Sequence, residues 1–188
     1  MDLRRWIADE HDGLAARWQS AVEAHVPRER WRESPGGGAS IGWLILHGAW
    51  HQDLAINGIV RDAPAIILGW RGPLGLDAVP AETGLGEAEQ PAVTAMVDLD
   101  ALVGYAATVH DATRRWLTEV DLATFDDVPD ASSRMETHGI TEASVPWLHA
   151  LWRAKPTSWF VQWEAIGHVQ GHLGEMIALR ARLGLSPF

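Results

Sequence analysis

The chain has 188 residues, a length that fits one domain spanning residues 1–188 with enough sequence to bury a core. Its formal net charge of -10, without any cluster of Lys and Arg, argues against nucleic acid as a partner, because phosphate binding needs a basic face. Cysteine is absent, which excludes disulfides, Cys-type zinc sites and a protein thiol nucleophile. Any metal ion must therefore be held by His, Asp or Glu.

The first helix is predicted over residues 2–25, where apolar residues recur at helical spacing until Pro27 ends the pattern. This segment lacks the apolar stretch of a secretory signal, and no stretch elsewhere reaches the roughly 20 apolar residues that cross a bilayer. We therefore expect a cytoplasmic protein with no membrane partner. After a Gly-rich hinge at residues 36–38, Ser40 is a suitable N-cap for a second, strongly apolar helix over residues 40–58.

Residues 59–96 are rich in Gly and Pro and have no sustained period. We expect a long irregular crossing there, in which only residues 65–68 look strand-like. Asp98 or Asp100 can cap a third helix, which has an apolar stripe and ends near residue 121.

A polar stretch at residues 126–142 leads to one short apolar helix at residues 145–152. The last helix is predicted over residues 157–183, and Gly184 supplies its C-terminal stop. The pattern predicts an all-α fold of four long helices joined by two long crossings, with one short extra helix.

Two pairs of histidines interrupt apolar rows on the predicted helices. His168 and His172 lie four residues apart on the last helix, and His47 and His51 have the same spacing on the second. Side chains at that spacing share one face, roughly 5 to 6 Å apart, where two imidazoles can converge on one ion. An unpaired buried imidazole costs on the order of 1 to 3 kcal/mol, so two inward pairs favour a shared metal ion over separate bonds to carbonyls and carboxylates. The spacing alone does not say which three of the four bind.

The sequences around these histidines resemble the DinB-like family. Residues 40–47, SIGWLILH, followed by residues 52–53, QD, are similar to the second helix of that family. Residues 168–176, HVQGHLGEM, are similar to its terminal HxxxHxGxx segment. Trp70 with residues 84–86, GLG, looks like the actinobacterial, mycothiol-linked branch. The similarity covers most of the chain.

This resemblance implies a four-helix bundle with long crossover loops around one divalent metal ion, held by His47, His168 and His172. Relatives include S-transferases that use bacillithiol or mycothiol and mycothiol-dependent maleylpyruvate isomerases, some of which have Glu where this chain has His168. Imidazole suits Zn, Ni, Fe and Cu alike, and availability favours zinc. His51 stands where the family has no ligand; it would be a base beside the ion, a fourth ligand or a packed neutral ring.

Three neutral imidazoles leave coordination positions open, which is typical of catalytic zinc sites. The leading hypothesis is a metal-dependent thiol transferase, in which a small-molecule thiol of mycothiol type attacks a small electrophile as thiolate. A second hypothesis is metal-assisted hydrolysis, with hydroxide as nucleophile and His51 or Glu175 as general base. If Glu175 is not the base, it is a solvent-exposed residue at the edge of the apolar row on its helix. A third hypothesis is a non-catalytic bundle in which the ion gives stability or the protein binds a ligand or partner.

Other residues receive narrower predictions. Arg61 and Arg71 in the long crossing are candidates to bind a carboxylate of the thiol or of the electrophile. Asp53 would either orient a ligand imidazole or cap a turn. His11 and His110 lie on or beside inward faces of the first and third helices and are interpreted as core histidines. Because relatives often associate through bundle faces, we expect a homodimer.

Overall fold

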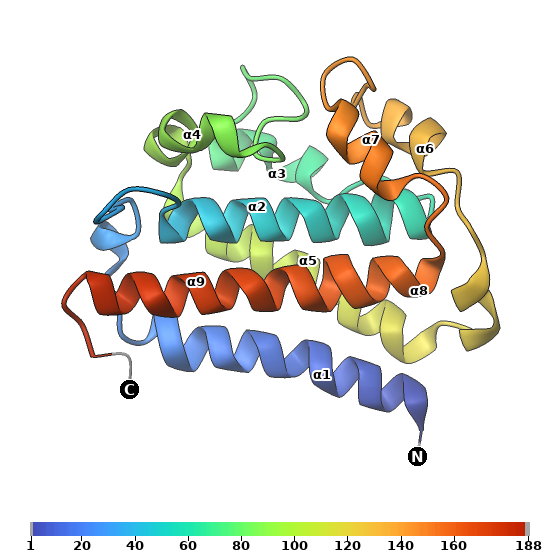
Figure 1. Cartoon of the computed structure of the whole chain (residues 1–188), viewed down its shortest axis with the longest axis horizontal. Coiled ribbons are helices and arrows are strands. Elements are labelled where there is room, and N and C mark those ends of the chain that lie inside the picture. Colours follow the sequence, from blue (N-terminus) through green and yellow to red (C-terminus); the bar gives the residue numbers. More distant parts are fainter. Residues whose placement is uncertain (1, 187–188) are drawn as a thin grey trace.

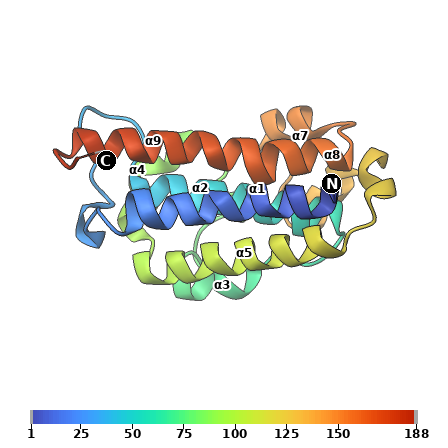
Figure 2. The same cartoon turned by 90° about the horizontal axis from the view of Figure 1, so that it is seen from below.

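The computed structural model describes residues 2–186, a range that contains helices and no strand, so the predicted all-α fold is confirmed. Four long helices lie side by side, as Figures 1 and 2 show from two directions. We call them the central helices: α1 (Leu3–Trp18), α2 (Ile41–Asp53), α5 (Leu99–Glu119) and α9 (His168–Arg182). Both α1 and α2 contact α5 and α9. No helix in the described range has the length and apolar character to cross a bilayer.

Short helices lie in the two crossings between the central helices. The first crossing holds α3 (Ile67–Leu74) and α4 (Gln90–Met96), and the second holds α6 (Ala131–Thr137), α7 (Pro146–Trp152) and α8 (Thr157–Phe160). In Figure 1, α3, α4, α6 and α7 gather on the side of the molecule next to α2. Wider, π-helical stretches continue α1 and α2 and join α8 to α9: Gln19–Glu23, Leu54–Val60 and Val161–Gly167. Short 3₁₀ turns lie at Arg28–Arg30, Glu87–Glu89 and Leu122–Asp126.

Side-chain caps fix where α2 and α5 begin. The hydroxyl of Ser40 accepts a hydrogen bond from the N–H of Trp43 at 3.2 Å. The carboxylate of Asp98 accepts from the N–H groups of Asp100 and Ala101, at 2.9 and 2.8 Å. Each cap satisfies N–H groups that the first turn of a helix leaves without a partner. The predicted cap at Ser40 is confirmed, and of the two candidates for α5 the structure uses Asp98.

The first crossing is more ordered than its sequence indicates. Residues 65–68, which look strand-like, lead into α3 instead. The reason is that the carboxylate of Asp53 accepts hydrogen bonds from the N–H groups of Ile66 at 2.9 Å and Ile67 at 2.8 Å. The same carboxylate accepts from the hydroxyl of Tyr105 on α5 at 3.0 Å. Of the two roles predicted for Asp53, the structure shows the capping role, at the start of α3.

The second crossing also holds a helix that the sequence pattern does not reveal. The polar stretch at residues 126–142 contains α6, which Asp130 caps by accepting from the N–H of Ser133 at 3.1 Å. The fully buried Met135 anchors this short helix, but so few inward residues make no visible period. The predicted helix at residues 145–152 is present as α7. The expectation of a single short helix is wrong, because α3, α4 and α6 accompany it.

α2 is buried on nearly every side, which places its histidines inside the molecule. Every residue of this helix except Ala49 is buried. It packs against α5, α9 and α4, so the apolar residues around its whole circumference have neighbours. This agrees with the rule that a helix apolar on all sides lies in the core.

A close approach between α3 and α5 gives a test of the packing. A Cβ added at Gly104 would stand 2.7 Å from Cη2 of Trp70. We expect Gly104→Ala to lower the free energy of unfolding by about 1–3 kcal/mol, because the indole must shift within a packed interface. Gly13→Ala is the matched control, since its Cβ would meet only Nη2 of Arg17, at 3.9 Å. The control should gain up to about 1 kcal/mol from better helix propensity. Urea denaturation measures both, and equal effects would contradict the close contact.

Candidate metal centre

Histidines from α2 and α9 meet between these two helices. His47 comes from α2, while His168 and His172 stand one turn apart at the start of α9. One nitrogen from each ring lies within 4.8 Å of the other two. The structure therefore brings together the three residues predicted as metal ligands, with His47 buried and the other two partly buried.

Two of these rings are fixed through Nδ1. Nδ1 of His47 lies 2.9 Å from the carbonyl oxygen of Gly84, and Nδ1 of His172 lies 3.0 Å from Oε1 of Glu175. Gly84 has a φ of 101°, a left-handed conformation that suits glycine. A carbonyl oxygen and a carboxylate only accept, so Nδ1 donates in both contacts. Each ring then keeps its Nε2 lone pair, the usual arrangement for a histidine that binds a metal.

His168 is held from the turn that precedes it. Its Nδ1 lies 3.4 Å from Oε2 of Glu164, and its Nε2 lies 2.8 Å from Nε2 of His172. Two ring nitrogens this close need a proton or a cation between them, because their lone pairs repel each other. A divalent ion would satisfy both nitrogens and Nε2 of His47 together.

The planes of the three rings suit a shared ion. The ring of His47 makes an angle of 81° with that of His168 and 71° with that of His172. The rings of His168 and His172 differ by 59°. An imidazole binds a metal along a lone pair in its own plane and can turn about that bond, so rings at these inclinations can share one tetrahedral ion.

Two of the candidate ligands are neutral at physiological pH. Burial, together with the neighbouring His51, lowers the pKa of His47 to about 2. Burial and the neighbouring His168 lower the pKa of His172 to about 3. A proton on either ring would place a cation among other imidazoles away from water. Because neutral imidazole is the form that binds a metal, neither ring has to lose a proton first.

A buried carboxylate lies beside the histidines. Glu164 is 0% exposed and belongs to the π-helical stretch Val161–Gly167. Its Oε1 accepts a hydrogen bond from the indole N–H of Trp152 at 2.6 Å. Burial favours a higher pKa for this carboxyl, but His168 and His51 outweigh burial and lower the pKa to about 2. Glu164 is therefore an anion, which would offset the positive charge of a divalent ion in the core.

His51 is packed beside the centre with partners of its own. Its Nε2 lies 3.3 Å from the carbonyl oxygen of Leu85, and its Nδ1 lies 3.3 Å from Oε2 of Glu164. His51, Glu164 and His168 form a second, overlapping group of ligand-type atoms. The Nδ1 contacts of both histidines with Oε2 are at ion-pair distance but lack hydrogen-bond geometry, which leaves these atoms unsatisfied. An ion would fit the first group better, because Glu164 would then stay available to the Nδ1 protons while the ion would separate the two close Nε2 atoms.

A cavity of about 330 Å³ opens beside His47, His51 and His168. Trp147 and Trp163 form part of its wall and are 45% and 46% exposed. The volume falls in the range of small-molecule pockets, about 300–1,000 Å³. A small molecule can therefore reach the edge of the histidine cluster.

The other residues predicted for the site have different surroundings. Arg61 donates to the amide oxygen of Asn57, and Arg71 donates to carbonyl oxygens of its own crossing, including that of Leu76. Neither arginine lines the cavity beside the histidines. The side chain of Glu175 is 55% exposed and contacts the centre only through its bond to a histidine Nδ1.

Glu164 and Gly84 are parts of the centre that the sequence analysis does not predict as site residues. Glu164 precedes His168 by four residues, so a row with steps of four, Glu164, His168 and His172, is the signal that points to it. Gly84 contributes only a carbonyl oxygen, for which the sequence carries no signal.

A third group, His11, Asp12 and His110, also gathers potential ligand atoms. The rings of His11 and His110 are parallel to within 7°, with centroids 4.2 Å apart. Two stacked rings cannot both direct an in-plane lone pair at one ion, so this arrangement does not suit a metal. The interpretation of these two residues as packed histidines agrees with their stacking.

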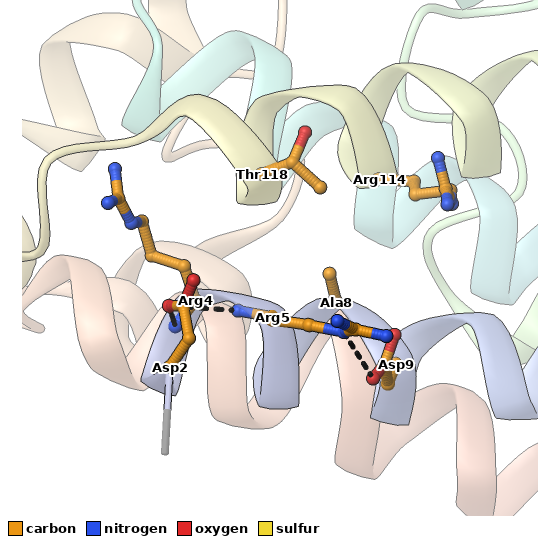
Figure 3. Close-up of a pocket in the computed structure, with 7 residues that line it drawn as sticks. All are labelled: Asp2, Arg4, Arg5, Ala8, Asp9, Arg114 and Thr118. Carbon is orange, nitrogen blue, oxygen red and sulfur yellow. Dashed lines mark hydrogen bonds and ion pairs between the residues drawn. The ribbon is translucent and has the colours of Figure 1, made fainter.

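A hollow of about 480 Å³ lies on the surface between α1 and α5 (Figure 3). Arg4, Arg5 and Arg114 line it. Arg5 pairs with Asp9 at 3.7 Å and Arg114 pairs with Asp12 at 2.6 Å, so two of the three cations are compensated. In Figure 3 the guanidinium groups of Arg4 and Arg114 lie at opposite ends of the hollow. They do not converge on one anion.

Comparison with known proteins adds information on the fold. No family model matches the chain, and no curated protein matches it. The chain is similar to a crystal structure described as the conserved protein of a locus from Enterococcus faecalis, with a TM-score of 0.65 and 19% sequence identity. The match covers 98% of this chain and 99% of that one. At this identity the likeness concerns the fold alone.

The position of Glu164 predicts its effect on metal affinity. We expect Glu164→Gln to weaken metal binding about 10–100-fold, because the amide keeps the shape but removes the anion that faces two Nδ1 atoms. Glu142→Gln is the control, since Glu142 pairs with Arg153 on the surface. Competition with a chromophoric chelator measures both affinities. Unchanged binding in Glu164→Gln would contradict the role assigned to this carboxylate.

The buried histidines also predict an acid-sensitive fold. In the unfolded chain His11 takes up a proton near pH 6.5, whereas burial, helped by His110, lowers its pKa to about 3 in the folded protein. Between these values the unfolded state binds more protons, so the free energy of unfolding falls as the pH falls. Between pH 6.5 and pH 5, His11 alone should lower the free energy of unfolding by about 1.5 kcal/mol. Urea unfolding of chelator-treated protein measures this loss, and His11→Gln should reduce it. An equal reduction in His25→Gln, which alters an exposed residue, would argue against this cause.

Proposed function

We propose that this chain is a DinB-like four-helix-bundle protein that holds one divalent metal ion with His47, His168 and His172. The observation that carries the proposal is the arrangement of the three rings, two of which are hydrogen-bonded through Nδ1. Each Nδ1 lies beside an acceptor, and each Nε2 is left for an ion. Zinc is the first choice, with nickel, iron and copper as alternatives, because imidazole binds all four. Three imidazoles would leave a coordination position for a small molecule.

The proposed reaction is transfer of a low-molecular-weight thiol of mycothiol type to a small electrophile. Held by His47, His168 and His172, a divalent ion would lower the pKa of a bound thiol, so that the thiol could react as thiolate at neutral pH. The sulfur forms a bond to an electrophilic carbon, the leaving group departs with the electron pair of its bond, and the thiol proton passes to solvent. The chain has no cysteine, so the thiol must be a co-substrate.

The residues around the centre have separate tasks in this proposal. Gly84, Glu164 and Glu175 hold the ligand imidazoles through Nδ1 and so keep Nε2 directed at the ion. Trp147 and Trp163 offer the electrophile an apolar surface on the wall of the cavity. Arg61 and Arg71 receive no task, because their partners lie elsewhere.

Metal-assisted hydrolysis is the second candidate, and the geometry supports it less. Hydrolysis needs a free general base. The two residues predicted for that role are engaged: His51 lies between the carbonyl of Leu85 and Glu164, and Glu175 is bonded to His172. Thiol transfer has no such requirement when the thiol reacts as thiolate.

A homodimer in the cytoplasm belongs to the same proposal. Both features come from the resemblance to DinB-like proteins and from the use of a low-molecular-weight thiol, which cells keep reduced in the cytosol.

Elemental analysis followed by a thiol assay tests the proposal. We expect about one divalent ion per chain, lost in His47→Ala and in His172→Ala because each change removes one of three ligands. His25→Ala changes an exposed histidine and should retain the ion. Metal-loaded protein should accelerate the reaction of mycothiol with 1-chloro-2,4-dinitrobenzene about tenfold or more over metal-free protein, with release of chloride.

The outcomes separate the candidate functions. No ion after reconstitution would refute the metal centre. Hydrolysis of an ester without added thiol would favour the hydrolase. An ion that raises the melting temperature without either reaction would favour a non-catalytic, metal-stabilised bundle.

A further inference from the structure

A second cavity, of about 220 Å³, lies among the four central helices. Residues of α1, α2, α5 and α9 all line it. Most of the lining is aliphatic, including Leu14, Leu44, Ile45, Val103, Leu173 and Met176. His172 also lines this cavity, whereas His47 and His168 line the cavity described above. The candidate metal centre therefore stands between the two cavities.

The size and lining of this second cavity suit an aromatic ring. An engineered cavity of about 150 Å³ lined by apolar side chains stays dry and binds benzene. The cavity among the central helices is larger than that, at about 220 Å³, and most of its wall is also apolar. It therefore has room for one ring with a small substituent.

A polar group for that substituent is present in the wall. His11 is 1% exposed, and its Nε2 lies 2.8 Å from the amide nitrogen of Gln52. Nδ1 of His11 is buried without a hydrogen-bond partner. Burial keeps this imidazole neutral, with a pKa lowered to about 3. A neutral ring with one unsatisfied nitrogen suits an uncharged hydroxyl or carbonyl group, because a buried polar atom without a partner is unfavourable.

The charges around the cavity argue against an anion. Glu23 and Asp111 are the charged residues, apart from histidines, that line it. Arg114 is close enough to act on the pKa of His11, but it is paired with Asp12 at 2.6 Å. A carboxylate in the cavity would meet like charge, and no Lys or Arg is among the described residues that line it.

We infer that the cavity among the central helices is a binding site for an uncharged small molecule with one aromatic ring and one hydroxyl or carbonyl group. The aliphatic wall takes the ring, and His11 with Gln52 takes the polar group. Because the site borders His172 but includes neither of the other two candidate ligands, it does not depend on a bound metal. It exists whether or not the proposed function is correct.

Calorimetric titration of the metal-free full chain with phenol, benzene and benzoate tests this inference. Phenol should bind with the highest affinity, benzene more weakly, and benzoate without measurable heat. Ala15→Leu should weaken phenol binding at least tenfold, because Ala15 lines the cavity and a leucine there would fill part of it. Ala16→Leu is the matched control, since the next residue of α1 is exposed and lies outside the cavity lining. Ala106→Leu, from α5, repeats the test should Ala15→Leu not fold.

A further variant tests the polar contact. His11→Leu should reduce the preference for phenol over benzene, and His11→Leu combined with Gln52→Leu should abolish it, while benzene still binds. Absence of phenol binding, equal effects of Ala15→Leu and Ala16→Leu, or tightest binding of benzoate would each overturn the inference. All titrations omit metal, so failure of the proposed metal centre would leave these results unchanged, and failure here would leave metal loading unaffected.

Discussion

A buried imidazole has two ring nitrogens to satisfy, and this requirement ties distant parts of the molecule to one another. The first crossing must pass over α2 so that the carbonyl of Gly84 meets Nδ1 of His47. The second crossing must return so that Glu164 stands beside His168, with Trp152 bonded to the other carboxylate oxygen. The short helices of both crossings hold these partners in place. With an acceptor bonded to Nδ1 of His47 and a carboxylate beside Nδ1 of His168, the Nε2 lone pairs are left for an ion that the cluster could hold.

Much of the fold follows from local signals in the sequence. Ser40 and Asp98 mark the starts of α2 and α5, because their side chains bond to N–H groups two or three residues away. The apolar character of α2 indicates its central position. The steps of four between His47 and His51 and between His168 and His172, set within apolar rows, are enough to predict two pairs of imidazoles on inward faces.

The rest depends on contacts that local sequence does not encode. α3 begins where the carboxylate of Asp53, more than ten residues earlier, caps it, and no periodicity within the first crossing reports that contact. Met135 holds α6 with too few inward residues to make a pattern. Glu164 precedes His168 by four residues, so the spacing places it on the same helix face. Acidic residues on helices are ordinarily exposed to solvent, however, and only the complete burial of Glu164 shows that it belongs to the centre.

The π-helical stretch Val161–Gly167 sets the phase between the two ends of the last long helix. A π-helical turn is an α-helical turn with one residue added. Loss of a single residue here would keep the helix continuous yet rotate Thr157–Phe160 by about 100° about the axis relative to α9. Either Phe160 would leave the core or His168 would turn from the carboxylate. When related sequences are aligned, a one-residue gap in this stretch therefore indicates a larger structural change than many substitutions do. It changes which side chains of the last long helix face the core, although every candidate ligand residue is still present.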